Sequence, residues 1–141
     1  MQHNYSLYGD VLIMDATYNI NKYKIPLLIF TGIASDGRNL CFGMACIYNE
    51  SAETYSWALK SFFAVHKSRP KLIVTDGDLA LCKALNMYKE DSYHFLCQWH
   101  IVRNFGRNFG FLQKKNEKLF KSLLGLPSLQ IRRNLRLIFN L

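Results

Sequence analysis

The first half of the chain alternates short apolar runs with short polar segments. Apolar residues dominate 10–19, 25–35 and 40–48, and β-branched or aromatic side chains occur in each run. Short and nearly continuous apolar runs of this kind are typical of strands buried on both faces. The dipeptide Asp36-Gly37, between the second and third runs, is a strong signal for a tight hairpin turn. These features predict three consecutive strands in an antiparallel meander.

After the third run, the apolar residues recur at helical spacing. This pattern predicts a helix within 49–66. Asn49 or Ser51 is the expected N-cap, and the acidic Glu50 and Glu53 are expected in the first turn, where negative charge is favourable.

Beyond this helix, strands and helices alternate. The sequence predicts a strand at 72–76, a helix at 78–89, a strand at 92–97 and a helix that begins at Trp99. Because helical crossovers join the third, fourth and fifth strands, the last two strands should be parallel and the sheet mixed. The expected fold is therefore α/β, with a five-stranded mixed sheet in the order β-β-β-α-β-α-β-α.

Two aspartates end predicted strands. Asp15 ends the first strand and Asp76 ends the fourth, which could lie beside the first strand and parallel to it. Both carboxylates would then lie at the carboxyl ends of strands about 4.8 Å apart, where open α/β sheets bind ligands. Carboxylates that close repel each other unless a proton or a cation lies between them, and Mg²⁺ prefers oxygen ligands.

A purely structural role explains the same residues. Asp15 could begin a turn, and Asp76 or Asp78 could be the N-cap of the following helix. Asp78 suits the cap better, because it directly precedes the apolar, helix-periodic run. The residues alone leave both roles open for Asp76, as a metal ligand or as a structural residue.

The net charge of +8 lies entirely in the last third of the chain. Residues 1–99 carry nine Lys/Arg and nine Asp/Glu, whereas residues 100–141 carry nine Lys/Arg and a single acid, Glu117. A segment of this composition is typical of polyanion binding, and a solvated basic helix face has the same composition. We expect residues 1–110 to form the core domain and 111–141 a basic amphipathic helical segment.

The remaining composition indicates a soluble intracellular protein. A chain of 141 residues, half of them apolar, can bury the core of one domain. Its apolar runs are far shorter than a membrane span of about 20 residues, and no signal peptide is visible. Without a signal peptide, the four cysteines are expected to be reduced thiols.

Three segments, at 15–28, 75–81 and 94–104, resemble the Mutator-like element (MULE) transposases, and the predicted helix 50–63 also fits that family. The resemblance extends over about residues 8–107. It implies an RNase H-like, integrase-type fold in which the first strand lies beside the fourth. It also implies a role in DNA transposition and recombination.

The resemblance further implies that Asp15 and Asp76 are the first two members of an acidic catalytic triad. In such enzymes the triad holds Mg²⁺ or Mn²⁺ while water or a DNA 3′-hydroxyl attacks a phosphodiester bond. The third member of the family triad is a glutamate far downstream, beyond a helical insertion. The later acids of this chain are Glu90, Asp91 and Glu117, and none of them is assigned that role. The active site expected from these 141 residues is therefore incomplete.

The same resemblance marks Cys97 and His100 as the Cys-x-x-His motif of the family. Two ligands are too few for a zinc site, which normally has three or four. His100 could orient a carboxylate or meet a phosphate, or the pair could be a buried cysteine and a hydrogen-bonded core histidine. His94 also matches the family, with no role that the sequence explains.

The resemblance to transposases implies that the basic residues after the predicted core bind DNA. DNA phosphates would attract them through a salt-sensitive term that is independent of sequence. The candidate DNA-binding residues are Arg103, Arg107, Lys114, Lys115, Lys118 and Lys121. Because neither a zinc finger nor a helix-turn-helix is visible, sequence-specific DNA recognition is expected elsewhere or not at all.

Four functions remain compatible with these observations. The first is the catalytic core of a MULE-type transposase, nuclear in a eukaryote and a candidate homo-oligomer when full-length. The second is a domesticated nuclear DNA-binding or regulatory protein without catalysis, and the third is an inactive relic. The fourth, an RNase H-type nuclease, would not explain the segment "CQWHIVRN". Whether the chain is an enzyme depends on the third acid.

Overall fold

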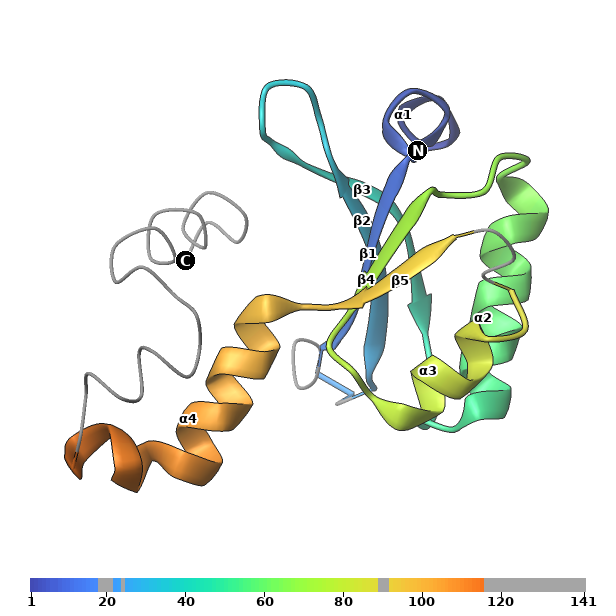
Figure 1. Cartoon of the computed structure of the whole chain (residues 1–141). Coiled ribbons are helices and arrows are strands. Elements are labelled where there is room, and N and C mark those ends of the chain that lie inside the picture. Colours follow the sequence, from blue (N-terminus) through green and yellow to red (C-terminus); the bar gives the residue numbers. More distant parts are fainter. Residues whose placement is uncertain (18–21, 24, 89–91, 116–141) are drawn as a thin grey trace. The chain divides into compact units, whose positions relative to one another are not determined.

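The structure, a computed structural model, describes residues 1–17, 22–23, 25–88 and 92–115. By its contacts the chain divides into two units, residues 1–96 and 97–141, and each is described by itself. The elements, labelled in Figure 1, are α1 (Gln2–Tyr8), β1 (Val11–Thr17), β2 (Leu27–Ile33), β3 (Asn39–Cys46), α2 (Ala52–Val65), β4 (Leu72–Thr75), α3 (Leu79–Leu85), β5 (Tyr93–Leu96) and α4 (Gln98–Lys115).

The five strands form one mixed sheet in the order β3-β2-β1-β4-β5. Within it, β1, β2 and β3 are antiparallel neighbours, as expected of a meander. The pairs β1–β4 and β4–β5 are parallel, because the helices α2 and α3 supply the long crossovers that parallel neighbours need. This arrangement confirms the predicted RNase H-like topology, with the first strand beside the fourth.

The hairpin between β2 and β3 forms where the sequence predicts it. Gly37 adopts a φ of 82°, a left-handed conformation that glycine tolerates without strain. The backbone N–H of Ala34 donates to the carbonyl of Arg38 at 2.9 Å and closes the turn.

The ends of α2 and α3 refine the sequence predictions. Ser51 is the N-cap of α2, because its side chain accepts the backbone N–H of Thr54 at 3.2 Å. Glu53 lies in the first turn as predicted, whereas Glu50 precedes the cap, so its predicted place in the helix was wrong.

The helix predicted at 78–89 is shorter in the structure and ends at Leu85. The backbone N–H groups of Met87 and Tyr88 donate to carbonyls three residues earlier, at 3.1 and 2.9 Å. Such bonds tighten the backbone into turns and do not continue the α-helical pattern. The apolar periodicity of the segment persists beyond the point where its backbone leaves the helix.

The core lies between the sheet and the helices α2 and α3, which run side by side along the sheet (Figure 1). Phe62 of α2 stacks on Phe30 of β2 with ring centroids 4.2 Å apart and planes 10° apart. Alternate residues of β1, β2 and β4 are buried in this core, and most of the residues between them are half-buried. The prediction of strands buried on both faces was therefore wrong, because the structure buries one face more completely than the other. The fully buried strand residues include Leu12, Met14, Leu28 and Ile73.

The sequence analysis missed the short helix α1. It has seven residues, and only Tyr5 among them is buried, so no apolar periodicity could reveal it. The Tyr5 ring lies edge-on to Phe42 and to Phe62, and its hydroxyl donates to the carbonyl of Ser68 at 3.2 Å. Burial raises the pKa of Tyr5 to about 12. Tertiary contacts of one aromatic side chain therefore hold this helix.

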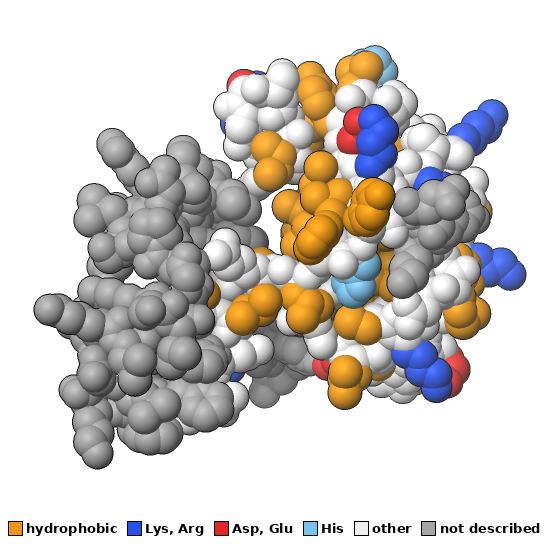
Figure 2. Space-filling view, viewed as in Figure 1, with side chains coloured by type: hydrophobic (Ala, Val, Ile, Leu, Met, Phe, Trp, Pro, Cys, Tyr) orange, Lys and Arg blue, Asp and Glu red, His pale blue; other side chains and the backbone are white. Residues whose placement is uncertain are grey.

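The edge strand β5 carries exposed apolar side chains. Figure 2 shows hydrophobic side chains gathered over the strands on the face that it presents. On β5, Tyr93, Phe95 and Leu96 are all exposed.

The structure agrees with the predicted state of the cysteines. All four cysteines are free thiols. In the part of the chain that the structure describes, none of the helices has the length and apolarity needed to span a bilayer.

The anchoring of α1 gives a stability prediction. We expect Tyr5→Ala to lower the free energy of unfolding by about 3–5 kcal/mol, as is usual for truncating a buried aromatic ring. Leu7→Ala is the matched control, because Leu7 lies on the same helix with an exposed fraction of 60%; its effect should stay within about 0.5 kcal/mol. Urea denaturation of both variants measures the difference, and equal losses would contradict the role of Tyr5.

Candidate functional site

The two predicted catalytic aspartates lie on neighbouring parallel strands. The register of β1 and β4 runs from Val11 opposite Leu72 to Met14 opposite Thr75. One residue beyond this register come Asp15 on β1 and Asp76 just after β4. The prediction that Asp15 ends its strand was wrong, because β1 continues to Thr17 through its pairing with β2. Both aspartates are half-buried. The two aspartates that the sequence singled out thus lie on neighbouring parallel strands, next to the last paired residues.

A tight turn after β4 separates the roles of Asp76 and Asp78. Asp78 is the N-cap of α3, and its carboxylate accepts the backbone N–H of Leu81 at 2.8 Å. Asp76 accepts the backbone N–H of Asp78 at 3.0 Å and lies outside the helix. Between them, Gly77 has a φ of 89°, which a residue with a side chain rarely adopts. Asp78 is therefore the cap, as predicted, and Asp76 does not cap α3.

A buried polar contact lies directly before this turn. The hydroxyl of Thr75, which is fully buried, is 2.9 Å from Nε2 of His94 on β5. The backbone N–H of Gly77 donates to the same hydroxyl at 3.3 Å. His94, to which the sequence assigned no role, is thus linked through Thr75 to the turn that carries Asp76.

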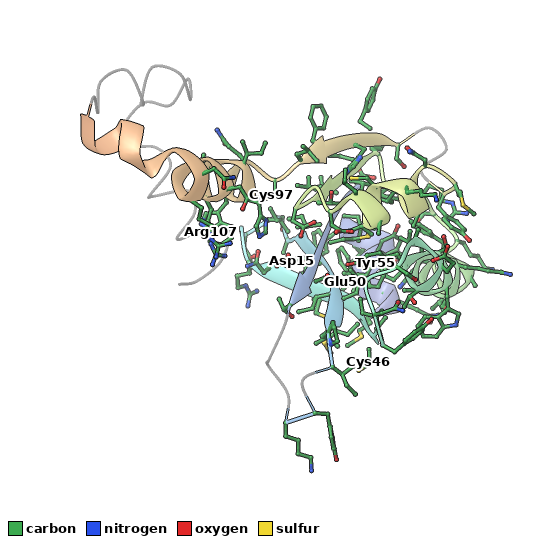
Figure 3. All side chains as sticks on the ribbon, turned by 90° about the horizontal axis from the view of Figure 1, so that it is seen from below. Asp15, Cys46, Glu50, Tyr55, Cys97 and Arg107 are labelled. Atoms are coloured by element: carbon green, nitrogen blue, oxygen red, sulfur yellow. The ribbon has the colours of Figure 1, made fainter. Side chains whose placement is uncertain are left out.

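Glu50 is an acid near this turn that the sequence analysis did not associate with the site. The segment before α2 holds it, and the hydroxyl of Tyr55 donates to its carboxylate at 3.1 Å (Figure 3). Burial raises the pKa of Glu50, and the negative charges of Asp78 and Asp76 raise it further. The carboxylates of Asp76 and Asp78 therefore disfavour a negative charge on Glu50.

Tyr55 responds to the same charges. Its side chain is fully buried, and burial raises the pKa of its hydroxyl, with Glu50 and Asp78 adding to the effect. A tyrosine that remains protonated is a dependable hydrogen-bond donor to the Glu50 carboxylate. No sequence signal reports this pairing, because both residues also fit an ordinary amphipathic helix start.

The carboxylates of Asp15 and Asp76 are suitable ligands for a hard divalent cation, but two ligands do not make a complete site. Two carboxylates on neighbouring strands offer oxygen ligands, which Mg²⁺ and Mn²⁺ prefer. Among the described residues, however, no group of three or more His, Cys, Asp or Glu side chains could hold a metal ion. The later acids Glu90, Asp91 and Glu117 lie outside the described residues. Asp15 and Asp76 therefore stay predicted metal ligands, and the described residues do not complete a metal site around them.

In the second unit, the Cys-x-x-His motif lies at the beginning of α4. The carbonyl of Cys97 accepts the backbone N–H of Ile101 at 3.1 Å, so Cys97 takes part in the first turn. Cys97 and His100 are both half-buried. The ring of Trp99 lies edge-on to His100 at 4.6 Å, and the guanidinium of Arg103 lies over the Trp99 ring at 4.7 Å.

Two of the six predicted DNA-binding residues have described side chains. Arg103 and Arg107 are exposed on α4, four residues apart and therefore on one face of the helix. Arg107 is labelled in Figure 3. Lys114 and Lys115 end α4, and Lys118 and Lys121 lie outside the described residues, as does most of the predicted segment 111–141. The predicted domain boundary at residue 110 stays a prediction.

Comparison with protein families gives one clear match. The model of the MULE transposase domain matches residues 11–104, from the beginning of β1 into α4. The matched segment contains both aspartates, the turn after β4 and the Cys-x-x-His motif.

Similar curated proteins come from Arabidopsis thaliana. Protein FAR1-RELATED SEQUENCE 5 is 30% identical over 90% of this chain, and protein FAR-RED IMPAIRED RESPONSE 1 is 30% identical over 81%. Protein FAR1-RELATED SEQUENCE 6 is 33% identical over 76% of the chain. The chain spans only 14–15% of the length of these relatives.

Among solved structures, the chain is similar to the HTLV-2 integrase catalytic core domain in complex with magnesium, in its trimeric form. The two chains are 19% identical with a TM-score of 0.42, and the match covers 93% of this chain and 83% of the other.

The pKa shift of Glu50 predicts how its charge affects stability. Because folding raises this pKa, the folded state holds the proton more tightly than the unfolded state, and rising pH costs stability. We therefore expect Glu50→Gln, which still accepts the Tyr55 hydroxyl, to raise the melting temperature near pH 7.5 and to change it less near pH 4. Thermal unfolding in metal-free buffer measures both values.

Glu53→Gln is the matched control with the opposite sign. Backbone hydrogen bonding and the Ser51 side chain lower the pKa of Glu53, so its charge stabilises the fold above the usual titration range of a carboxyl group. Its removal should lower the melting temperature near pH 7.5 and matter less near pH 4. If Glu50→Gln also destabilised the protein near pH 7.5, the unfavourable environment assigned to Glu50 would be refuted.

Proposed function

Because the chain belongs to the MULE transposase domain family, we propose that it forms the catalytic core of a MULE-type DNA transposase, in which Asp15 and Asp76 hold a divalent metal ion. The observation that supports this proposal is the parallel register of β1 and β4, whose last pair, Met14 and Thr75, directly precedes Asp15 and Asp76. Carboxylates at adjacent strand ends repel each other, and a cation between them removes that repulsion.

The proposed chemistry is cleavage and transfer of DNA strands. When bound, Mg²⁺ or Mn²⁺ would stabilise the charge that develops on a phosphodiester under attack by water or a DNA 3′-hydroxyl. Asp15 and Asp76 contribute oxygen ligands from a rigid sheet, and rigid supports preserve the geometry that such a reaction needs. The exposed Arg103 and Arg107 contribute contacts to DNA phosphates.

A third acid is required for the complete reaction in this proposal. Glu90, Asp91, Glu117 or a residue beyond this chain would supply it. Since the chain spans about 15% of the length of its relatives, the activity of the whole protein includes parts that lie outside these 141 residues.

A second candidate function is a domesticated, transposase-derived DNA-binding or regulatory protein of the nucleus. Two observations favour it. The described residues lack a group of three or more metal-ligating side chains, and one similar protein is named for a far-red response. In this case the domain binds DNA without a requirement for metal.

Metal titration tests the first function. We expect the wild-type domain to bind Mn²⁺, and we expect Asp15→Asn and Asp76→Asn each to weaken binding by about tenfold or more, since even outer-shell substitutions cost 10–100-fold. Both variants should remain folded, because each replaces a half-buried carboxylate by an amide of equal size. Isothermal titration calorimetry measures the affinity, and circular dichroism measures the fold.

Asp10→Asn is the matched control for this titration. Asp10 lies at the opposite end of the β1–β4 pair, where it forms an exposed ion pair with Lys71 at 2.8 Å. Its removal should leave Mn²⁺ affinity unchanged. Identical titration curves for wild type, Asp15→Asn and Asp76→Asn would remove the metal assignment and favour the regulatory function.

DNA binding is tested through its dependence on salt. For a duplex of about 30 base pairs, we expect Arg107→Gln to weaken binding and to reduce the slope of log K against log [salt] by about 1, as for one lost phosphate contact. Lys60→Gln, on the exposed side of α2, is the control and should change neither quantity. Fluorescence anisotropy at several salt concentrations gives both slopes, and an unchanged slope for Arg107→Gln would contradict the DNA contact.

A further inference from the structure

A buried hydroxyl, that of Thr75, links the turn that carries Asp76 to the neighbouring strand β5. Thr75 is the last residue of β4 and is fully buried. Its hydroxyl accepts the backbone N–H of Gly77 at 3.3 Å and lies 2.9 Å from Nε2 of His94. Because a buried hydroxyl without a hydrogen-bond partner destabilises the fold, this contact has a strong tendency to persist.

The strand register explains why His94 can reach this hydroxyl. His94 pairs with Ile73, two residues before Thr75, and Leu96 pairs with Thr75 itself. Because side chains alternate along a strand, His94, Leu96 and Thr75 share one face of the parallel pair. The imidazole therefore lies diagonally across from the threonine, within reach of a long side chain.

The backbone of the turn has little freedom to compensate. Gly77 has a φ of 89°, and a Cβ placed on it would lie 3.3 Å from Cδ2 of Leu96. Asp76 accepts the N–H of Asp78, and Asp78 is committed to capping α3. The position of Asp76 therefore depends on two sets of contacts. The residue before it, Thr75, contacts His94 of β5, and the residues after it lead into the N-cap of α3.

We propose that His94 is a positioning residue: by holding the Thr75 hydroxyl, it fixes the Gly77 amide and thereby the direction in which Asp76 leaves the sheet. The inference deepens the proposed function and rests on it for its consequence at the metal. Either imidazole tautomer satisfies the geometry, because the hydroxyl can donate to Nε2 or accept from it.

The first test uses variants that remove the hydrogen bond and keep the packing. Thr75→Val is nearly isosteric and lacks the hydroxyl, and His94→Leu fills the space without a polar atom. We expect each to weaken Mn²⁺ binding by about three- to tenfold, since positioning groups beyond the ligands typically affect metal affinity on this scale or above. Thr75→Ser and His94→Gln, which retain the hydroxyl and a polar atom near the place of Nε2, should restore most of the affinity.

A double-mutant cycle separates positioning from general destabilisation. If His94 acts through Thr75, adding His94→Leu to Thr75→Val should cause no further loss of Mn²⁺ affinity. Additive losses, or wild-type affinity in both single variants, would overturn the inference.

Ser92→Ala supplies the structural control. Ser92 is buried and donates to the carbonyl of Pro70 at the opposite end of the β4–β5 pair. Its loss should lower the melting temperature and leave Mn²⁺ affinity unchanged. A loss of affinity equal to that of His94→Leu would show that any weakening of β5 suffices, and the inference would fail.

Amide hydrogen exchange in metal-free protein provides a readout that does not depend on the proposed function. In His94→Leu and Thr75→Val, the Gly77 amide should exchange about tenfold faster, whereas the Leu81 amide, held by the Asp78 cap, should be unchanged. If wild type binds no Mn²⁺, the proposed function fails, and accelerated exchange at Gly77 still supports the link from His94. If wild type binds Mn²⁺ and the Gly77 amide is unaffected in both variants, the inference fails alone.

Discussion

The parallel pairing of β1 with β4 is the contact on which the rest of the first unit depends. It joins the antiparallel meander of β1, β2 and β3 to the part of the chain that alternates strands and helices. A parallel pair requires a long crossover, and the chain from β2 to α2 supplies it. The same pairing buries Leu12 against Ile73 in the register and carries Asp15 and Asp76 to one end of the sheet. Fold stability and the candidate site thus share one constraint.

The acids at this end of the sheet have different physical roles. Asp78 stabilises a helix end, where a carboxylate satisfies backbone N–H groups and meets the favourable end of the helix dipole. Asp76 extends from a turn fixed by a glycine and a buried threonine. Burial and the charges of Asp78 and Asp76 disfavour the ionised form of Glu50, whereas the hydrogen bond from the Tyr55 hydroxyl favours it. The unfavourable effects are the larger, and the pKa of Glu50 is therefore raised.

The two units of the chain differ in charge as they differ in structure. Residues 1–99 carry equal numbers of acidic and basic side chains. The electrostatic potential near Asp15 and Asp76 therefore depends on which charged side chains lie close to them. The excess positive charge begins on α4, where Arg103 and Arg107 are exposed on one face. Under the proposed function, these exposed arginines would neutralise DNA phosphates.

The sequence by itself determined the five strands and their order along the chain. It also determined that Asp15 belongs to the first strand and that Asp76 directly follows the fourth. Apolar runs of strand length at β1, β2 and β4, and the turn at Gly37, are local signals, and the short connections leave few topologies open. Tertiary structure alone decided the helix α1, the end of α3 at Leu85, and the surroundings of Glu50 and His94. The helix α1 and His94 depend on partners distant in sequence: Tyr5 donates to Ser68, and His94 contacts Thr75, 19 residues away. Periodicity records which residues are buried, whereas hydrogen bonds and charges between elements arise only once the sheet has brought those elements together.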